Sequence, residues 1–318
     1  MLACAGKTCD TWSRKGSHLK SDLLKAAFAR YEKYQAWLKR QPLSDQTRRA
    51  YKTRINHFLG FLGTSDEDIR KLIENEREAE YVLREYKQYL KRDLKARPAT
   101  VNAYLTAISH FLQFAGARPV KFAREDLPQE APRALSKEDQ KRFLRAIVAC
   151  RRSKDRAVAL LLFYSGIRIS ECAALDLDDV YVIGRKHRIT VRNGKGDRYR
   201  EIPLNSEVKE ALQDWLAERN TKFQDKITDD AFFLNPQGKR LSTASLDLII
   251  RKIGQSCSVE LSAHVLRHTC LTNLVRNGND LVVVAEIAGH RRLETTRRYT
   301  LPTSQDREKA MAGLISDR

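Results

Sequence analysis

Apolar residues recur every three or four positions along the first third of the chain, a spacing that predicts one amphipathic helix after another. The segment SDQTRRAYKTRINHFLGFLG begins with Ser44, whose hydroxyl suits a helix N-cap, and stops at Gly63. Similar patterns cover residues 68–94 and 100–116, and Pro98 precedes the second of them. Residues 21–116 are therefore predicted to form a small, all-helical domain.

The periodic pattern stops over residues 117–132, where ARPVKFAREDLPQEAP contains three prolines and is typical of a linker. A second domain over residues 133–318 begins with ALSKEDQKRFLRAI, in which Ser136 and Asp139 resemble a capping box. Within this domain HRITVRNGKGDRYREIPL is the exception, because β-prone runs flank a turn that favours a hairpin. The predicted fold class is thus mainly α, with a small β-sheet or hairpin in the second domain, and residues 1–20 are expected to be a flexible extension.

The composition agrees with two soluble globular domains, since 42% of the 318 residues are hydrophobic and 31% are charged. No apolar run is long enough to span a bilayer, and the first residues lack the apolar stretch of a signal peptide, so a cytoplasmic protein is expected. The six cysteines show neither C-x-x-C spacing nor partner histidines at zinc-like spacing. We therefore expect neither a metal site nor a disulfide framework.

The net charge narrows the class of partner. The chain has 59 lysines and arginines against 40 aspartates and glutamates, which gives a net charge of +19. A polyanion such as nucleic acid is the expected partner. A membrane surface is the weaker option, because the basic residues run through both halves of the chain instead of gathering on one amphipathic helix. Charge alone does not separate an enzyme from a packaging protein.

Groups able to donate hydrogen bonds to a phosphate stand on four separate segments of the second domain. They are Arg168, Lys195, His264, Arg267 and His290. Tyr299 follows nine residues after the last of them, in IAGHRRLETTRRYT. Taken singly, each residue has an ordinary explanation: Arg168 could pair with Glu171 on a helix, Lys195 could be a solvated turn residue, and Tyr299 could belong to the core. The functional interpretation of these residues therefore depends on the order and spacing of the whole set.

Five motifs along the chain resemble, in their order and approximate spacing, those of the tyrosine recombinases, also called the phage integrase family. They are SGIRISE, NGKGDRYREIPL, HVLRH, IAGH and RRYT. The resemblance is close over residues 135–301, and residues 21–116 are more loosely similar to the family's helical, SAM-like core-binding domain. It implies a DNA-binding helical domain followed by a mostly helical catalytic domain.

The resemblance also implies a role for each candidate. The matched catalytic positions are Arg168, Lys195, His264, Arg267, His290 and Tyr299. Tyr299 takes the place of the nucleophile, which in this family attacks a phosphodiester to give a 3′-phosphotyrosine and a free 5′-hydroxyl, with no metal and no cofactor. Glu171 is expected to orient Arg168, and His268 is expected to be structural.

These residue types suit that reaction. Two guanidiniums can hold the non-bridging oxygens of a phosphate while negative charge develops on them, as a metal would otherwise do. A free tyrosine has a pKa of about 10, so its hydroxyl needs a proton acceptor, for which His264 is the preferred candidate. Lys195, on the hairpin, is the candidate acid for the leaving oxygen.

The implied partner is double-stranded DNA with specific recombination sites, bound by a tetramer on two such sites, with a nucleoid-associated location and room for an accessory directionality factor. The tail over residues 302–318 could fold back on its own domain or, as is common in the family, dock on a neighbouring protomer. Two alternatives stay open. One is a DNA-binding protein of this fold that does not cut and acts as an architectural or regulatory factor, and the other is a type IB topoisomerase.

Overall fold

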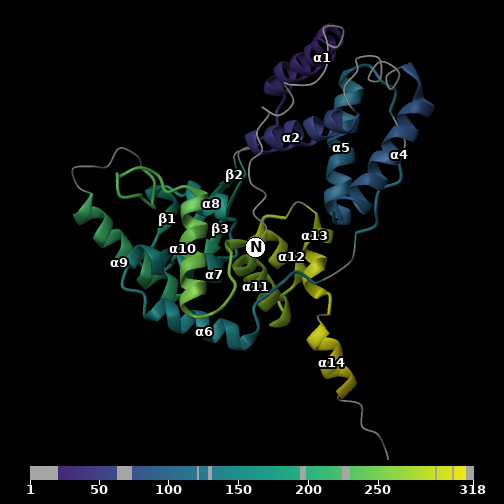
Figure 1. Cartoon of the computed structure of the whole chain (residues 1–318). Helices are drawn as coiled ribbons and strands as arrows, with labels where there is room; N and C mark the ends of the chain where they lie inside the picture. Colours follow the sequence, from purple (N-terminus) through teal and green to yellow (C-terminus); the bar gives the residue numbers. More distant parts are fainter. Residues whose placement is uncertain are drawn as a thin grey trace, which may run out of the picture. The chain divides into compact units, whose positions relative to one another are not determined.

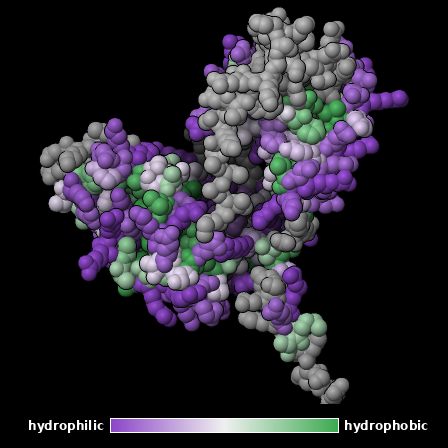
Figure 2. Space-filling model, in the orientation of Figure 1, coloured by the Kyte–Doolittle hydropathy of each residue, from purple (hydrophilic) through white to green (hydrophobic). Residues whose placement is uncertain are grey.

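The computed structural model of the chain describes residues 21–62, 74–119, 122–127, 131–193, 198–223, 230–290, 292–302 and 304–312 (Figure 1). The chain divides into two compact units between Pro128 and Gln129, and each unit has its own hydrophobic core. Hydrophilic residues dominate the described surface in the view of Figure 2. None of the helices in the described ranges combines the length and apolar character that crossing a membrane requires.

The N-terminal unit consists of helices whose starts follow from their first residues. Ser44 accepts a hydrogen bond from the amide of Thr47, as the sequence predicts, and Pro98 occupies the first turn of its helix, where a missing N–H is tolerated. The apolar faces meet in an aromatic-rich core that contains Phe58 and Phe111. The described helices of this unit are α1 (Ser21–Arg40), α2 (Asp45–Phe61), α4 (Glu76–Arg92) and α5 (Pro98–Phe114).

The prediction of one continuous helix over residues 68–94 is wrong, because the helix is interrupted at Asn75. The backbone of Asn75 is extended, and its side chain accepts hydrogen bonds from two amides of the first helical turn, so α4 begins at Glu76. The spacing of apolar residues does not predict such a cap, because it contains no information about a polar side chain that accepts hydrogen bonds from backbone amides. The end of α2 predicted at Gly63 lies outside the described residues.

The C-terminal unit is built around helix α7, whose residues 157–163 are buried. This helix packs against α6, α9, α10 and α11. Helix α6 begins after Ser136, whose hydroxyl accepts a hydrogen bond from the amide of Asp139 as the sequence predicts. The helices are α6 (Lys137–Val148), α7 (Ser153–Ser165), α8 (Ile169–Ala174), η3 (Leu177–Asp179), α9 (Ser206–Lys222), α10 (Thr243–Ser256), α11 (Ala263–Arg276), α12 (Leu281–Ala288), α13 (Leu293–Arg297), η4 (Arg298–Thr300) and α14 (Ser304–Ala312).

A three-stranded antiparallel sheet, in the order β1-β2-β3, lies within this unit. Its strands are β1 (Val180–Tyr181), β2 (Arg188–Asn193) and β3 (Arg198–Pro203). Ile189 pairs with Ile202 and Val191 with Arg200, so these side chains share the inner face of the sheet. The two strands of the predicted hairpin and the mainly α fold with a small sheet are confirmed. Lys195, between β2 and β3, lies outside the described residues.

Candidate active site

Tyr299 lies in the short helix η4 and is buried, with 6% of its surface exposed. Its hydroxyl is 2.9 Å from Nδ1 of His268, and its ring stacks on the ring of His290 with the two planes 8° apart. The rest of the side chain belongs to an apolar cluster with Leu271 and Val284. The hydroxyl of Tyr299 is therefore directed toward α11.

Helix α11 begins after the N-cap Ser262 and brings three of the predicted residues together. His264, Arg267 and His268 are three and four positions apart, which places them on adjoining turns of one face. The rings of His264 and His268 meet edge to face, with their centroids 4.0 Å apart. The contact with the hydroxyl of Tyr299 is made by His268, which the sequence predicts to be structural, so a second imidazole competes with His264 for the role of base.

Arg267 is buried and connects α11 to two other segments. Its guanidinium donates to the carbonyl of Gly166, to the carbonyl of Ala288 at 2.8 Å and to Nε2 of His290 at 3.0 Å. A guanidinium only donates, so Nε2 of His290 accepts and the ring proton lies on Nδ1, which is 2.9 Å from the hydroxyl of Thr296. His290 is thus held as a neutral ring in one orientation.

Burial lowers the pKa of the imidazoles in this cluster. The pKa of His268 falls to about 4, through burial first and then through His264, and the pKa of His290 falls to about 4, through burial first and then through Arg267. Burial raises the pKa of Tyr299, while nearby guanidiniums, Arg267 foremost, act in the opposite direction. At neutral pH the hydroxyl of Tyr299 therefore contacts an uncharged imidazole in a cationic setting.

Arg168 caps helix α8 and contacts Glu171 as expected. Its amide and its NH1 donate to Glu171 at 2.8 and 2.7 Å, and its NH2 donates to the carbonyl of Gly289 at 3.1 Å. Arg200 of β3 is absent from the residues predicted from the sequence, yet it donates to both carboxylate oxygens of Glu171, at 3.2 and 2.8 Å. The alternation in RYREIPL is the signal that could have revealed it, because it places an arginine at an inward position of a strand.

Contacts among α8, α11, the end of α12 and η4 gather most of the predicted set in the C-terminal unit. The residues gathered are Arg168, Glu171, His264, Arg267, His268, His290 and Tyr299. Over the ranges that the structure describes, His, Cys, Asp and Glu side chains form no group of three that could hold a metal ion. The described cysteines are free thiols.

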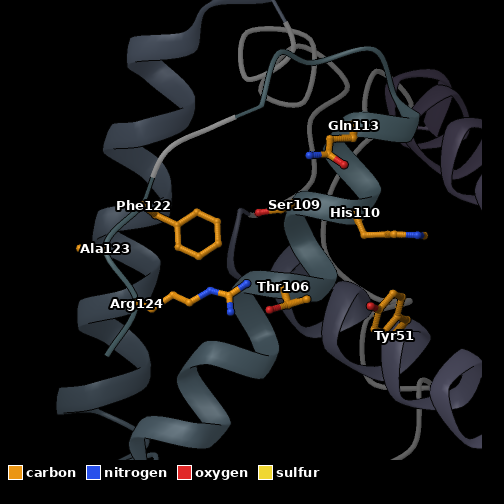
Figure 3. Close-up of a pocket in the computed structure, with 8 residues that line it drawn as sticks. All are labelled: Tyr51, Thr106, Ser109, His110, Gln113, Phe122, Ala123 and Arg124. Carbon is orange, nitrogen blue, oxygen red and sulfur yellow. The ribbon is translucent and has the colours of Figure 1, made fainter. Parts of the chain in front are cut away.

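A hollow of about 660 Å³ lies in the N-terminal unit, apart in sequence from the predicted catalytic set. Figure 3 shows the Phe122 ring and the Arg124 guanidinium directed toward Ser109 and Thr106 of α5. Tyr51 of α2 lines it as well. The lining of the hollow thus combines an exposed cation with hydroxyl groups.

The chain is similar to known proteins in its family, its sequence and its structure. A family model described as "Phage integrase family" matches residues 133–306. Tyrosine recombinase XerC of Actinobacillus pleuropneumoniae is 42% identical over 149 residues, which are 46% of this chain and 47% of that protein. Tyrosine recombinase XerA of Thermococcus kodakarensis is 27% identical over 267 residues, which are 77% of this chain and 93% of that protein. The pre-cleavage complex of the XerH site-specific recombinase with its difH substrate superimposes with a TM-score of 0.59 and 25% identity, over 75% of this chain and 71% of that one.

Proposed function

Because the chain belongs to the phage integrase family of tyrosine recombinases, we propose that it breaks and rejoins duplex DNA at specific sites through a covalent bond between Tyr299 and a 3′-phosphate. The observation that carries the proposal is the hydroxyl of Tyr299, 2.9 Å from an imidazole and flanked by guanidiniums. The phenolic oxygen attacks phosphorus, the bond from phosphorus to the 5′ oxygen breaks, and that oxygen takes up a proton. A 5′-hydroxyl from another strand reverses the step, so neither water nor a nucleotide is consumed.

Arg168 and Arg267 supply the positive charge for this reaction. The side chain of Arg168 is 40% exposed and so retains an open side for a phosphate. Burial, with Arg168 nearby, lowers the pKa of Arg267 to about 10, which leaves it protonated at neutral pH. Its bonds to the carbonyls of Gly166 and Ala288 fix its position. Charge that is oriented before the reaction stabilises the transition state without reorganisation.

His268 is the acceptor of the tyrosine proton in this scheme. Its Nδ1 already lies at hydrogen-bond distance from the hydroxyl of Tyr299, which is the geometry a general base needs. His264 is exposed in the first turn of α11, where it is suited to donate a hydrogen bond to the phosphate instead. The two histidines thus divide the roles that the sequence gives to His264 alone.

Lys195 is the proposed acid for the leaving 5′ oxygen. A lysine has an ordinary pKa of about 10.4, so it carries a proton to give at neutral pH. Replacing the 5′ oxygen by sulfur makes a leaving group that needs no acid. Lys195→Ala is therefore expected to cut ordinary DNA slowly and the sulfur-substituted DNA at the wild-type rate, and a defect of equal size on both would contradict the assignment.

Duplex DNA is the proposed partner of both units. The charge of +19 favours a polyanion, and exposed cations such as Arg49 of α2 and Arg124 beside the hollow are candidates for phosphate contacts. Such contacts give affinity that falls steeply with salt, while a few groove contacts read the site. DNA binding would place the protein with the nucleoid.

A tetramer on two DNA sites is the proposed assembly, with the tail as a link between protomers. Helix α14 is tied to α11 by an ion pair of 2.6 Å between Asp306 and Arg276, while Met311 is 67% exposed and free to contact a neighbour. Deleting residues 304–318 should therefore leave binding of a single site intact and abolish synapsis, measured by electrophoretic mobility. Unchanged synapsis would contradict the proposal.

A trapped cleavage reaction tests the proposed function. Duplexes are first selected by the wild-type protein from a random pool and then nicked beside the scissile bond, so that the short fragment carrying the new 5′-hydroxyl diffuses away and cannot reverse the step. Wild-type protein should leave a DNA adduct that survives a denaturing gel, and Tyr299→Phe should leave none. Binding by both proteins without an adduct would favour the DNA-binding protein that does not cut, and relaxation of supercoiled plasmid that lacks the site would favour a type IB topoisomerase.

A further inference from the structure

Arg200 is a strand residue whose guanidinium is turned into the C-terminal unit. It shares the inner face of the sheet with Ile202, and its side chain is 12% exposed. Its NH1 and NH2 donate to the two carboxylate oxygens of Glu171 at 3.2 and 2.8 Å, and its Nε donates to the carbonyl of Ile287 at 2.9 Å. One guanidinium therefore fastens β3 to α8 and to the last turn of α12.

The same contacts reach the guanidinium proposed to bind phosphate. Glu171 also accepts from the amide and the NH1 of Arg168, and Arg168 in turn donates to the carbonyl of Gly289. The carbonyl of Ile287, two residues before Gly289, accepts a hydrogen bond from Arg200, so the contacts of Arg168 and those of Arg200 meet on the same short backbone segment. Arg200 thus bonds directly to Glu171 and to the carbonyl two residues before Gly289, whose own carbonyl accepts from Arg168.

Gly289 makes this arrangement possible. Its φ of +64° lies in the left-handed region, and a Cβ at this position would lie 2.7 Å from NH1 of Arg200. A larger residue would strain the turn and displace the guanidinium. Since His290 follows directly, the turn that carries His290 rests against Arg200 as well.

The charges in this cluster do not cancel. Burial raises the pKa of the Glu171 carboxyl, but hydrogen bonds from Arg200 and Arg168 outweigh burial and hold that pKa below its ordinary value. One ionised carboxylate is therefore shared by two guanidiniums, and two positive charges less one negative charge leave one positive charge. Without Arg200, Glu171 would neutralise Arg168 alone and remove the charge that a phosphate needs.

We propose that Arg200 is a positioning residue that holds Glu171 so that Arg168 stays oriented and positively charged toward the scissile phosphate. The inference rests on the proposed function, in which Arg168 contacts that phosphate. Lysine cannot replace Arg200, because a single ammonium group does not span two carboxylate oxygens and the carbonyl of Ile287 in one fixed geometry.

The test compares Arg200→Lys with Arg188→Lys in the full chain. Arg188 is the matched control, because it lies in β2 of the same sheet and forms a partly exposed ion pair of 3.0 Å with Glu201. The substrate is the nicked duplex selected by the wild-type protein. At saturating DNA, Arg200→Lys is expected to slow adduct formation by roughly 10–100-fold, as expected for a residue that orients a functional side chain. DNA affinity should stay close to wild type, and the melting temperature should fall through the lost hydrogen bonds while the variant stays folded at the assay temperature. Arg188→Lys should react at the wild-type rate.

A second substrate separates positioning of Arg168 from a general loss of structure. A methylphosphonate at the scissile position has no charge on its non-bridging atoms and so depends less on Arg168. The defect of Arg200→Lys should shrink on this substrate, as the defect of Arg168→Lys should, whereas a defect of equal size on both substrates would overturn the inference. If Arg200→Lys does not fold, Gly289→Ala, which places a Cβ against the Arg200 guanidinium, is tested on the same two substrates. An adduct formed by Arg200→Lys at the wild-type rate overturns this inference alone, and the absence of any wild-type adduct overturns the proposed function and the inference with it.

Discussion

A histidine–tyrosine pair of the N-terminal unit and one of the C-terminal unit show nearly the same hydrogen bond. In the N-terminal unit the hydroxyl of Tyr34 lies 2.8 Å from Nδ1 of His110, and in the C-terminal unit the hydroxyl of Tyr299 lies 2.9 Å from Nδ1 of His268. All four groups are wholly or partly buried, and burial lowers the pKa of both histidines. The bond alone therefore does not distinguish a structural tyrosine from a nucleophile.

The surroundings of the two pairs differ in charge. Tyr34 packs among aromatic rings such as Phe111, and burial followed by neighbouring tyrosines raises its pKa well above the ordinary value. Tyr299 also has a raised pKa through burial, but Arg267, Arg298 and Arg168 oppose the rise. Guanidiniums stabilise both a phenolate and a phosphate, so their presence distinguishes a candidate nucleophile from a tyrosine that makes an ordinary core contact.

The largest expected effect comes from removing the two hydroxyls in turn. Tyr299→Phe should reduce adduct formation to background while DNA binding is kept, because no other group supplies the nucleophile. Tyr34→Phe is the matched control and should form the adduct at the wild-type rate, with a loss of stability of about 1 kcal/mol from the broken hydrogen bond. Adduct formation and chemical denaturation measure the two effects, and loss of the adduct in both variants would show that Tyr299 is not distinguished from Tyr34 by its chemistry.

Removing the imidazole from the Tyr299 pair should have the next largest effect. His268→Gln should slow adduct formation by roughly 10²–10⁴-fold, the usual contribution of a positioned general base. His110→Gln, in the N-terminal pair, should leave the rate unchanged at saturating DNA. A fast His268→Gln together with a slow His264→Gln would return the role of base to His264.

Changing the cationic surroundings should have a somewhat smaller effect. Arg168→Lys keeps the charge but loses the fork of donors, so adduct formation should slow by roughly 10²–10³-fold. Arg77→Lys, in the exposed first turn of α4, should change neither the rate at saturation nor the product. Single-turnover kinetics check the pair, and an Arg168→Lys rate equal to wild type would show that this guanidinium does not contact the reacting phosphate.

The smallest effect concerns stability and pH. The folded chain lowers the pKa of His268 to about 4, so between pH 6.5, the ordinary value, and pH 4 the unfolded chain binds a proton that the folded chain does not. The free energy of unfolding should therefore fall as the pH drops through this range. His268→Gln lacks this contribution, so its melting temperature should decline less steeply than that of the wild type. Parallel curves would mean that His268 is not held in its neutral form.

The sequence predicts local structure well where a single residue decides it. The caps at Ser44 and Ser136 and the strands of the hairpin follow from residue types at fixed offsets. The cap at Asn75 escapes prediction because it interrupts a pattern that otherwise continues. The contact of Arg200 with Glu171 escapes it too, because 29 positions separate the two residues and only the folded sheet brings them together.

Within the candidate site, too, the sequence predicts what local segments decide and not what tertiary contacts decide. The order of the motifs points to Arg168, Arg267 and Tyr299, because each motif is a short local segment. Which histidine faces the tyrosine depends on how η4 packs against α11, and that choice is made by tertiary contacts rather than by spacing. Sequence order thus predicts membership of the site better than the role of each member.

Peptide mapping of the trapped adduct identifies the residue that attacks the DNA. The wild-type protein is captured on the nicked duplex, digested with protease and nuclease, and analysed by mass spectrometry for the peptide that carries a nucleotide. The nucleotide is expected on Tyr299 and on neither Tyr34 nor Tyr86, although the hydroxyl of Tyr86 also lies 2.7 Å from Nδ1 of a histidine, His57. A nucleotide on any other tyrosine, or on a residue of another type, would contradict this expectation.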